Sequence, residues 1–344
     1  MKVLIVGAGL AGYCTAHHLL ETGAEILIID NGKNVSSAVA AGIINPVVFR
    51  RTTLSWRVTE LIAYGYPFYQ KLEELTGQHF FRKVPIRRLF SHEQERETWL
   101  KKQDQENFSS YLKPLSKEDL EFDLPQNTFG TGIVLNSASV NAKIFLEANK
   151  QFFISKGYYK NEQFDHEKLD PEAGSYNNET FDHVIFCEGK DALYNPWFSN
   201  LPLSQTKGEI LDVKLPLPAS ESLNRKCFLM PQEDGTFKTG STYVWDTDDN
   251  TPTEEGKKQI LKNLASITEE TAEVIRHEAG VRPTVSDRRP LLGRHPEFPK
   301  LVILNGLGTK GYMIAPLISR ELVEHLVNNT ELHPETAISR FRNA

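Results

Sequence analysis

A glycine pattern near the start of the sequence restricts the fold more than any other feature. Residues 2–6 form a short apolar run typical of a buried strand, and residues 10–21 have the apolar spacing of a helix. Gly7, Gly9 and Gly12 lie between them with the spacing G-x-G-x-x-G. This spacing allows a tight turn, close approach of a pyrophosphate to the backbone, and close packing of helix on strand. It predicts a dinucleotide-binding βαβ unit.

An acidic residue occupies the position that such a unit requires. A second apolar run, residues 25–29, ends at Asp30, which follows Gly12 by 18 residues. An acid at this point accepts hydrogen bonds from ribose hydroxyls and disfavours the extra phosphate of NADP. The helix N-terminus offers N–H groups and its positive dipole end to the phosphates. The motif alone does not separate FAD from NAD, and a glycine turn that only packs the helix is the alternative.

Length and composition set further bounds. The 344 residues exceed the roughly 250–300 at which one core stops growing, so we expect two domains. A net charge of −6 and a pI near 6.0 argue against a nucleic-acid partner, which requires a basic surface. No apolar stretch approaches a membrane span, so we expect a cytoplasmic protein. The three cysteines form no CxxC pair, which excludes a zinc ribbon, and no metal is expected.

The remaining periodicity predicts a second domain inserted into the first. Short alternating runs, typical of an antiparallel sheet, occupy residues 208–214, 227–231, 236–243 and 275–281. Helical spacing and buried strands flank them at residues 57–76, 92–105, 140–153, 181–186, 254–266, 301–305 and 313–327. The predicted fold class is therefore α/β, a Rossmann-like FAD/NAD(P)-binding domain with an inserted antiparallel-sheet (α+β) substrate domain. The basic pairs at 50–51, 87–88 and 288–289 are interpreted as solvated surface or as anchors for an anion in a pocket.

Motifs in the second half of the chain point to one family. They are Lys207-Gly208-Glu209, Phe228-Leu229-Met230-Pro231, Gly280-Val281-Arg282-Pro283, residues 290–297, residues 306–311 and Ala315-Pro316. Together they resemble the D-amino-acid oxidase family of FAD-dependent oxidoreductases, most nearly glycine oxidase and the FAD domain of the bifunctional tRNA-wobble-uridine modification enzyme. The resemblance implies an FAD-binding domain at 1–80, 130–205 and 283–344 and a substrate domain at 81–129 and 206–282. It also implies non-covalent FAD, because segment 283–293 has no cysteine.

The resemblance also assigns the FAD contacts. They fall on Gly7, Gly9, Leu10, Ala11, Gly12, Asp30, Asn31, Ser36, Ser37, Ala41, Gly42, Ile43, Gly189, Gly306, Leu307, Gly308, Thr309, Lys310, Gly311, Tyr312 and Met313. Ser36 and Ser37 have hydroxyls for a phosphate. The turn at 306–311 opens a helix whose N–H groups would face the N1–C2=O edge of the flavin, where negative charge collects on reduction. Lys310 would reinforce that charge, and the alternative is an exposed loop lysine.

The substrate contacts implied by the resemblance are Arg282, Phe228 and Tyr243. Arg282 matches the family's carboxylate-binding arginine, whose planar fork makes two parallel bonds to a carboxylate. The alternative is an internal ion pair between Arg282 and Asp287. The tyrosine that helps to hold the carboxylate in glycine oxidase falls on Phe228, which donates no hydrogen bond. Tyr243 and Tyr312 are candidates to replace it, and the catalytic set comprises Arg282 and Lys310.

Three functions follow from these residues. The leading hypothesis is an FAD-dependent oxidoreductase that removes a hydride from the Cα or N-alkyl carbon of an amine or amino acid to give an imine. The second is an oxidoreductase of the tRNA-modification type that acts on a carboxymethylamino group. The third is a non-catalytic binding protein that keeps only the flavoprotein fold. The electron acceptor, whether oxygen, a quinone or a protein, is left open.

Overall fold

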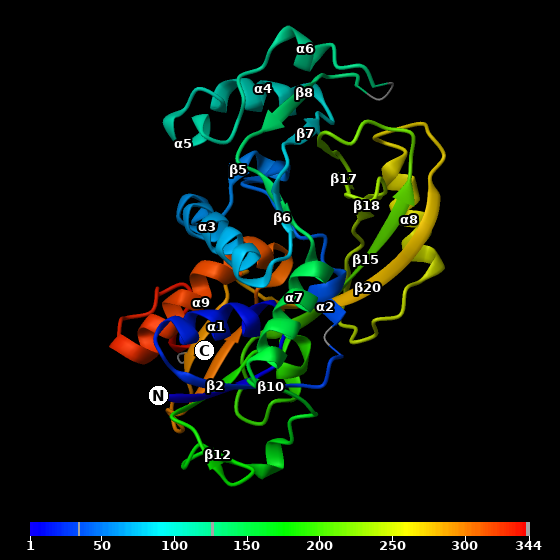
Figure 1. The fold of residues 1–344 in the computed structure, drawn as a ribbon. Helices are drawn as coiled ribbons and strands as arrows, with labels where there is room; N and C mark the ends of the chain where they lie inside the picture. Colours follow the sequence, from blue (N-terminus) through cyan, green and yellow to red (C-terminus); the bar gives the residue numbers. More distant parts are fainter. Residues whose placement is uncertain (34, 125–126, 342–344) are drawn as a thin grey trace.

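Two sheets account for most of the strands. The computed structural model describes residues 1–33, 35–124 and 127–341. A six-stranded sheet surrounded by helices forms the lower part of the molecule in Figure 1, and an eight-stranded sheet stands above it. Within the described ranges, no helix is long and apolar enough to cross a membrane. The predicted α/β class with a Rossmann-like domain is confirmed.

The six-stranded sheet contains the predicted βαβ unit. Strand β1 spans Lys2–Val6, helix α1 spans Leu10–Glu21 and strand β2 spans Glu25–Asp30. The strand order is β10-β2-β1-β14-β22-β21, and only the β21–β22 pair is antiparallel. The apolar side chains of β1 are almost completely buried, because helices and loops cover both faces of a parallel sheet. The other strands are β10 (Tyr159–Asn161), β14 (His183–Phe186), β21 (Leu291–Arg294) and β22 (Leu301–Asn305).

Helices pack on this sheet through apolar stripes that the sequence predicts. Helix α9 spans Gly311–Asn328 and packs against α1 and against α3, which spans Val58–Thr76. Leu61, Phe68 and Leu72 of α3 are buried, as their spacing predicts. The other helices of this layer are α2 (Val35–Val39) and α7 (Ala142–Ser155).

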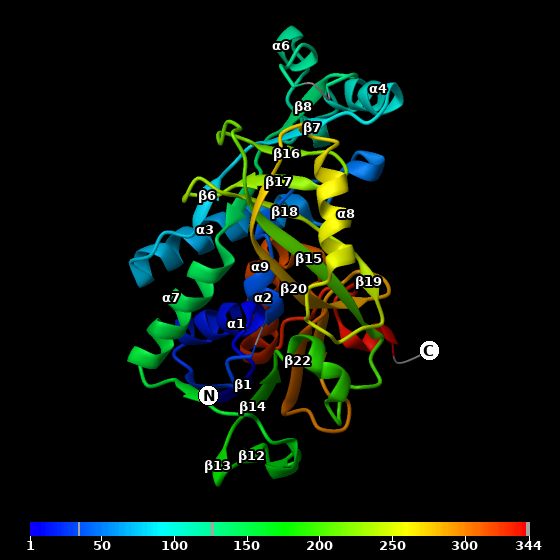
Figure 2. The same cartoon turned by 90° about the vertical axis from the view of Figure 1, so that its right-hand side faces the viewer.

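The eight-stranded sheet is built around one long antiparallel pair. Strand β15 spans Leu203–Lys214 and β20 spans Glu273–Val285, with Gly208 opposite Gly280. From β15 the sheet continues through β18, β17, β16, β7 and β8, while β19 pairs with the other end of β15. Helix α8, Glu254–Leu264, lies along this sheet (Figure 2). The other strands are β7 (Ile86–Leu89), β8 (Thr131–Val134), β16 (Ser222–Asn224), β17 (Phe228–Pro231), β18 (Phe237–Gly240) and β19 (Val244–Trp245).

Strand β8 bears on the proposed division into domains. The predicted boundary at residue 130 assigns this strand to the FAD-binding domain, but β8 pairs with β7 in the eight-stranded sheet. We therefore propose that the first substrate-domain segment continues to Val134.

The small elements of the chain are β3 (Ile43–Ile44), β4 (Val47–Val48), η1 (Phe49–Arg51), β5 (Thr53–Leu54), β6 (Phe81–Lys83), β9 (Ala138–Val140), η2 (His166–Lys168), β11 (Leu169–Asp170), β12 (Ser175–Tyr176), β13 (Glu179–Thr180), η3 (Gly189–Tyr194), η4 (Gly308–Lys310) and η5 (Ile338–Phe341).

The segment predicted as one helix at 92–105 forms a projection at the top of Figure 1. Helix α4 spans Glu93–Lys102, and two further turns follow, α5 at Glu106–Ser109 and α6 at Lys117–Leu120. The arginine pair at 87–88 anchors this projection and is neither solvated nor free to bind an anion, which corrects our interpretation. Arg87 is buried against Asp119 and Glu221, and Arg88 is buried against Glu95.

Candidate active site

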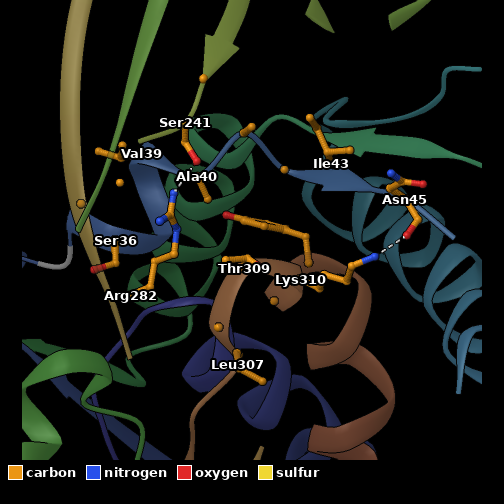
Figure 3. A pocket seen from close by; sticks show the side chains of 18 of the residues that line it. Ser36, Val39, Ala40, Ile43, Asn45, Ser241, Arg282, Leu307, Thr309 and Lys310 are labelled. Atoms are coloured by element: carbon orange, nitrogen blue, oxygen red, sulfur yellow. Dashed lines mark hydrogen bonds between the residues drawn. The ribbon is translucent and has the colours of Figure 1, made fainter. Parts of the chain in front are cut away.

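A cavity of about 430 Å³ lies between the two sheets (Figure 3). We use the term floor for the lining residues at the starts of α1 and α9 and in segment 36–49, which includes most of α2 and the short strands β3 and β4. Its roof consists of the residues of β15–β18 and β20 that face the floor. Of the predicted residues, those that line the cavity are Gly9, Leu10, Ala11, Ser36, Ser37, Ala41, Gly42, Ile43, Gly189, Leu307, Gly308, Thr309, Lys310, Gly311, Tyr312, Phe228, Tyr243 and Arg282. Those outside its lining are Gly7, Gly12, Asp30, Asn31, Gly306 and Met313.

The glycine motif brings the backbone of α1 into the floor. Gly7 has a φ of 102°, and a Cβ atom there would lie 2.5 Å from the Cys187 carbonyl oxygen. A Cβ atom on Gly12 would lie 1.9 Å from the Gly7 carbonyl oxygen, so this glycine allows α1 to approach the turn. Gly9 begins the helix without a side-chain cap. The first turn of α1 therefore presents backbone N–H groups and a positive dipole end to the cavity.

Asp30 lies behind this turn and fixes its shape. One carboxylate oxygen accepts a hydrogen bond from the Ala8 amide at 2.8 Å, and the other accepts one from the Gly32 amide at 2.7 Å. The neighbouring Asn31 donates to Gln163. A carboxylate has about four acceptor positions, so Asp30 retains capacity for a ribose hydroxyl. Its role as a ribose acceptor stays a prediction.

Ser36 and Ser37 differ in whether the hydroxyl proton is available to a ligand. The Ser36 hydroxyl donates to the Val281 carbonyl oxygen, so its proton is already engaged. The Ser37 oxygen accepts from the Leu10 amide at 3.2 Å and keeps its own proton. We therefore propose Ser37 rather than Ser36 as the hydroxyl that reaches a phosphate.

A second helix start completes the floor. The short helix η4 leads directly into α9, and no side chain caps this junction at Lys310. The Tyr312 hydroxyl donates to the Ser37 carbonyl oxygen at 3.0 Å and so ties this helix to α2. Because that hydroxyl is engaged, Tyr312 does not replace the missing substrate-binding tyrosine.

Lys310 is half-buried beside neutral acceptors. Its ammonium group donates to the Asn45 carbonyl oxygen at 2.8 Å and to the Ser55 hydroxyl. Figure 3 shows the side chain directed towards Asn45, on the opposite side of the cavity from Arg282. Burial lowers the pKa of Lys310 to about 8, and in the described part of the chain no carboxylate pairs with it. The alternative of an exposed loop lysine is therefore wrong, and an anion in the cavity would stabilise this charge.

Arg282 occupies the roof, and no carboxylate of the described residues pairs with it. One guanidinium nitrogen, Nη2, donates to the Ser241 hydroxyl at 3.0 Å. The other, Nη1, is buried and has no hydrogen-bond partner among the described residues. Burial lowers the pKa of Arg282. The alternative pairing with Asp287 is wrong, since Asp287 accepts from Arg340 at 2.9 Å.

Gly208 makes room for this guanidinium group. A Cβ atom at Gly208 would lie 1.8 Å from Nη2 of Arg282, so the group lies flat across β15. Gly208 lies in a motif that resembles the family, but it was not predicted as a site residue. The signal was present, because a glycine inside a strand often marks close approach of another group. Ser241 and Asn45 were not predicted as site residues either. Ser241 lies in the run 239–242, which also resembles the family, and Asn45 lies shortly before the basic pair at 50–51.

Tyr243 lies at the rim above Arg282. The arginine Cζ atom is 5.1 Å from the centre of the tyrosine ring, and the tyrosine is 56% exposed. Phe228 lies further along the roof, opposite Gly240 in the sheet. We propose that Tyr243 covers the bound carboxylate and that Phe228 contributes only apolar surface.

The chain is similar to flavin-dependent oxidoreductases along nearly its whole length. The family model described as FAD dependent oxidoreductase, DAO, matches residues 2–325. Glycine oxidase of Pseudomonas aeruginosa is 25% identical over 360 residues, which cover 94% of each chain. The tRNA 5-methylaminomethyl-2-thiouridine biosynthesis bifunctional protein of Idiomarina loihiensis is 23% identical and covers 99% of this chain, which matches 59% of that protein.

Solved structures share the fold. Glycine oxidase from Geobacillus kaustophilus superposes with a TM-score of 0.81 at 21% identity and covers 96% of each chain. Iminodiacetate oxidase from Chelativorans sp. BNC1 superposes with a TM-score of 0.76 at 23% identity, covering 97% of this chain and 99% of the other. The fold and the family match define a flavoprotein with a Rossmann-like FAD-binding fold. The chain belongs to the DAO family of FAD-dependent oxidoreductases, which act on amino acids or amines, and FAD is its cofactor.

Proposed function

We propose that this protein oxidises an amino acid or N-substituted amino acid at the Cα or N-alkyl carbon and releases an imine. The observation that carries the proposal is the buried Nη1 atom of Arg282, which has no partner in the described chain and borders the FAD cavity. A buried cation donor without an acceptor is costly, so the site is suited to a ligand that supplies a carboxylate.

The residues of the chain would divide the work. When bound, FAD supplies a flavin that accepts a hydride from the carbon next to a neutral amine. Arg282 holds the substrate carboxylate through its planar fork and so fixes the carbon relative to the floor. Ile210 and Phe228 exclude water from the roof. The start of α9 and the ammonium group of Lys310 stabilise negative charge that develops at the floor.

The FAD assignment fits the chain's own geometry. Among the described residues, neither helix start that faces the cavity has a side-chain cap. At the start of α1, Gly7 and Gly12 leave no room for a Cβ atom. Such uncapped N–H groups are suited to the phosphates and to the electron-rich edge of the ring. We expect the cofactor to be non-covalent.

The test is anaerobic reduction of the purified yellow protein. Glycine, D-amino acids and N-methyl amino acids are mixed with the holoenzyme, and flavin absorbance is followed. We expect at least one class to bleach the flavin. The variant Arg282→Lys should weaken substrate binding roughly 10- to 100-fold, because a lysine cannot make the two parallel bonds. The matched control is Arg276→Lys, which changes an exposed arginine on the same strand.

The outcomes separate the proposal from its alternatives. If no amine or amino acid reduces a bound flavin, the proposed substrate class is wrong. A colourless protein that refuses added FAD would favour the non-catalytic alternative. Stopped-flow reoxidation of the reduced enzyme in air then distinguishes oxygen from another electron acceptor.

A further inference from the structure

The cavity has a second polar end, far from Arg282. It continues along the roof past β18 and β17 to the turn between β16 and β17, where Asn224 and Lys226 line it. Ile210 and Phe228 line the stretch between the two ends. The guanidinium group of Arg282 lies over β15, and β16 is three strands further on, which corresponds to roughly 14 Å at the usual strand spacing. The cavity therefore offers two polar ends joined by an apolar wall.

Asn224 presents hydrogen-bond donors at this second end. Its side-chain oxygen accepts from Nη1 of Arg88 at 2.8 Å. Because a guanidinium group only donates, this contact fixes the orientation of the amide and turns its NH₂ group away from Arg88. Arg88 itself is neutralised by Glu95 at 2.7 Å. In the described part of the chain no group accepts from these donors, which are thus fixed in place before a ligand binds.

One exposed cation lies at the same end, and two more follow a cavity residue in the sequence. Lys226 is exposed, and in the described part of the chain no acidic side chain lies within 4.0 Å of its ammonium group. On the facing wall Phe49 lines the cavity, and the exposed side chains of Arg50 and Arg51 follow it, also without an acidic partner among the described residues. The Arg88 guanidinium lies 4.9 Å from the Phe49 ring and so links this wall to Asn224. In a chain of net charge −6, this is a local positive excess.

We propose that the substrate carries a second anionic group, a carboxylate or a phosphate, which binds to the Asn224 amide and the Lys226 ammonium group. Its first carboxylate binds to Arg282, and an apolar segment of several atoms lies against Ile210 and Phe228. Arg50 and Arg51 attract the distal anion without direct contact. The substrate class is therefore an amino acid whose nitrogen substituent or side chain ends in an acid. This inference rests on the proposed function, because Arg282 anchors the first carboxylate in both.

A small acid explains these features better than a nucleic acid. The donors of Asn224 line the cavity, whereas a protein that binds nucleic acid needs cations spread along a surface to follow successive phosphates. The apolar wall between the two polar ends matches a hydrocarbon segment. RNA is therefore kept as an outcome of the test.

The test compares acids of equal length with one or two charges. The holoenzyme is titrated with straight-chain dicarboxylic acids from glutarate to suberate and with monocarboxylic acids of the same chain length. Flavin absorbance and calorimetry report the dissociation constants, so no turnover is required. We expect one dicarboxylate to bind roughly tenfold more tightly than its monocarboxylate, as a charge-assisted contact predicts. The ω-phosphono acid of that length shows whether phosphate or carboxylate is preferred.

Variants locate the second end. Asn224→Asp keeps an acceptor for Arg88 but replaces the donors with a charge, so it should reverse the preference for the dianion. Lys226→Gln should reduce the preference to twofold or less. Lys258→Gln removes an exposed lysine from α8, outside the cavity lining, and should leave the tenfold preference intact.

Each result has a distinct meaning. The proposed second anion site is overturned if the dicarboxylate and the monocarboxylate bind equally well, or if the preference for the dicarboxylate survives Asn224→Asp. Either result leaves the proposed function standing. If neither acid binds, the carboxylate site at Arg282 fails, and both proposals fail with it. Salt-sensitive displacement of the dicarboxylate by low-micromolar tRNA overturns the assignment to a small acid.

Discussion

The floor and the roof of the cavity offer different groups to a ligand. The floor presents backbone N–H groups from two uncapped helix starts, and its only unpaired charge is Lys310 among the described residues. The roof presents side chains from an antiparallel sheet, above all Arg282 and Phe228. Backbone N–H groups suit a cofactor that is the same in every related protein, because their position depends on the glycine spacing and not on the other side chains. Side chains suit a substrate, because each position can differ between related proteins.

The two half-buried cations of the cavity, Lys310 and Arg282, differ in the same way. Lys310 already donates to two neutral oxygens, whereas Arg282 keeps one nitrogen without any acceptor in the described chain. Lys310 is therefore suited to stabilising charge at a distance, while Arg282 is suited to direct binding. The following predictions test whether floor and roof are separable in this way.

The largest effect is expected from Gly12→Ala in the floor. A Cβ atom there would lie 1.9 Å from a backbone oxygen, so α1 must move away from the turn. We expect the purified variant to lose its yellow colour, with a dissociation constant for FAD at least 100-fold higher. The absorbance ratio of flavin to protein measures this directly. Gly65→Ala is the matched control, because its Cβ atom meets only ordinary contacts at 3.8 Å, and it should retain FAD.

The next prediction concerns how the free energy of unfolding of the apoprotein depends on pH. The pKa of Lys310 is about 8 in the folded chain and 10.5 ordinarily. Between these values the unfolded chain binds more protons, so the free energy of unfolding should rise as the pH rises. The gain is roughly 3 kcal/mol across this window. Lys310→Met should abolish this contribution in urea titrations of the apoprotein at pH 7.5 and 10.5.

The comparison with an exposed lysine isolates this effect, since other groups also titrate at alkaline pH. Lys258→Met should keep the pH dependence of the wild-type chain. If Lys310→Met kept it too, the burial of an unpaired charge in the floor would be refuted.

A smaller effect is expected from Gly208→Ala in the roof. The added Cβ atom would occupy the place of the Arg282 guanidinium group, which must then shift from its position across β15. We expect substrate carboxylate to bind roughly 30-fold more weakly, about 2 kcal/mol. FAD should be retained, because no floor residue changes. Loss of FAD in this variant would show that floor and roof are coupled.

The floor was more predictable from sequence than the roof, for a physical reason. The floor depends on Gly7, Gly9 and Gly12 at fixed spacing within one βαβ unit, so local sequence specifies it. The roof depends on register between distant strands, such as Thr206 opposite Arg282. No short-range pattern specifies that register.

Individual residues show the same limit. Arg282 was identified only through a family motif. Only the structure shows that Asp287 pairs with Arg340 and not with Arg282. The burial of Arg87 and Arg88 depends on acids up to 134 positions away in the sequence, which a local reading could not find. The direction of Lys310 towards Asn45 depends in the same way on a loop 265 residues earlier.

The smallest predicted effect tests the departure from glycine oxidase that the resemblance predicts at Phe228. Phe228→Tyr adds a hydroxyl to the apolar stretch of the roof between its two polar ends. If Phe228 marks a changed substrate rather than a lost contact, the hydroxyl should strengthen binding of a short acid such as glycolate by about 1 kcal/mol or less. It should weaken binding of a six-carbon dicarboxylate, because the hydrocarbon segment would then face a polar group. Calorimetry on the holoenzyme with both acids measures the two changes together. A variant that binds both acids more tightly would show that the roof at Phe228 does not select for length, and that the site differs from its relatives only by a missing hydrogen bond.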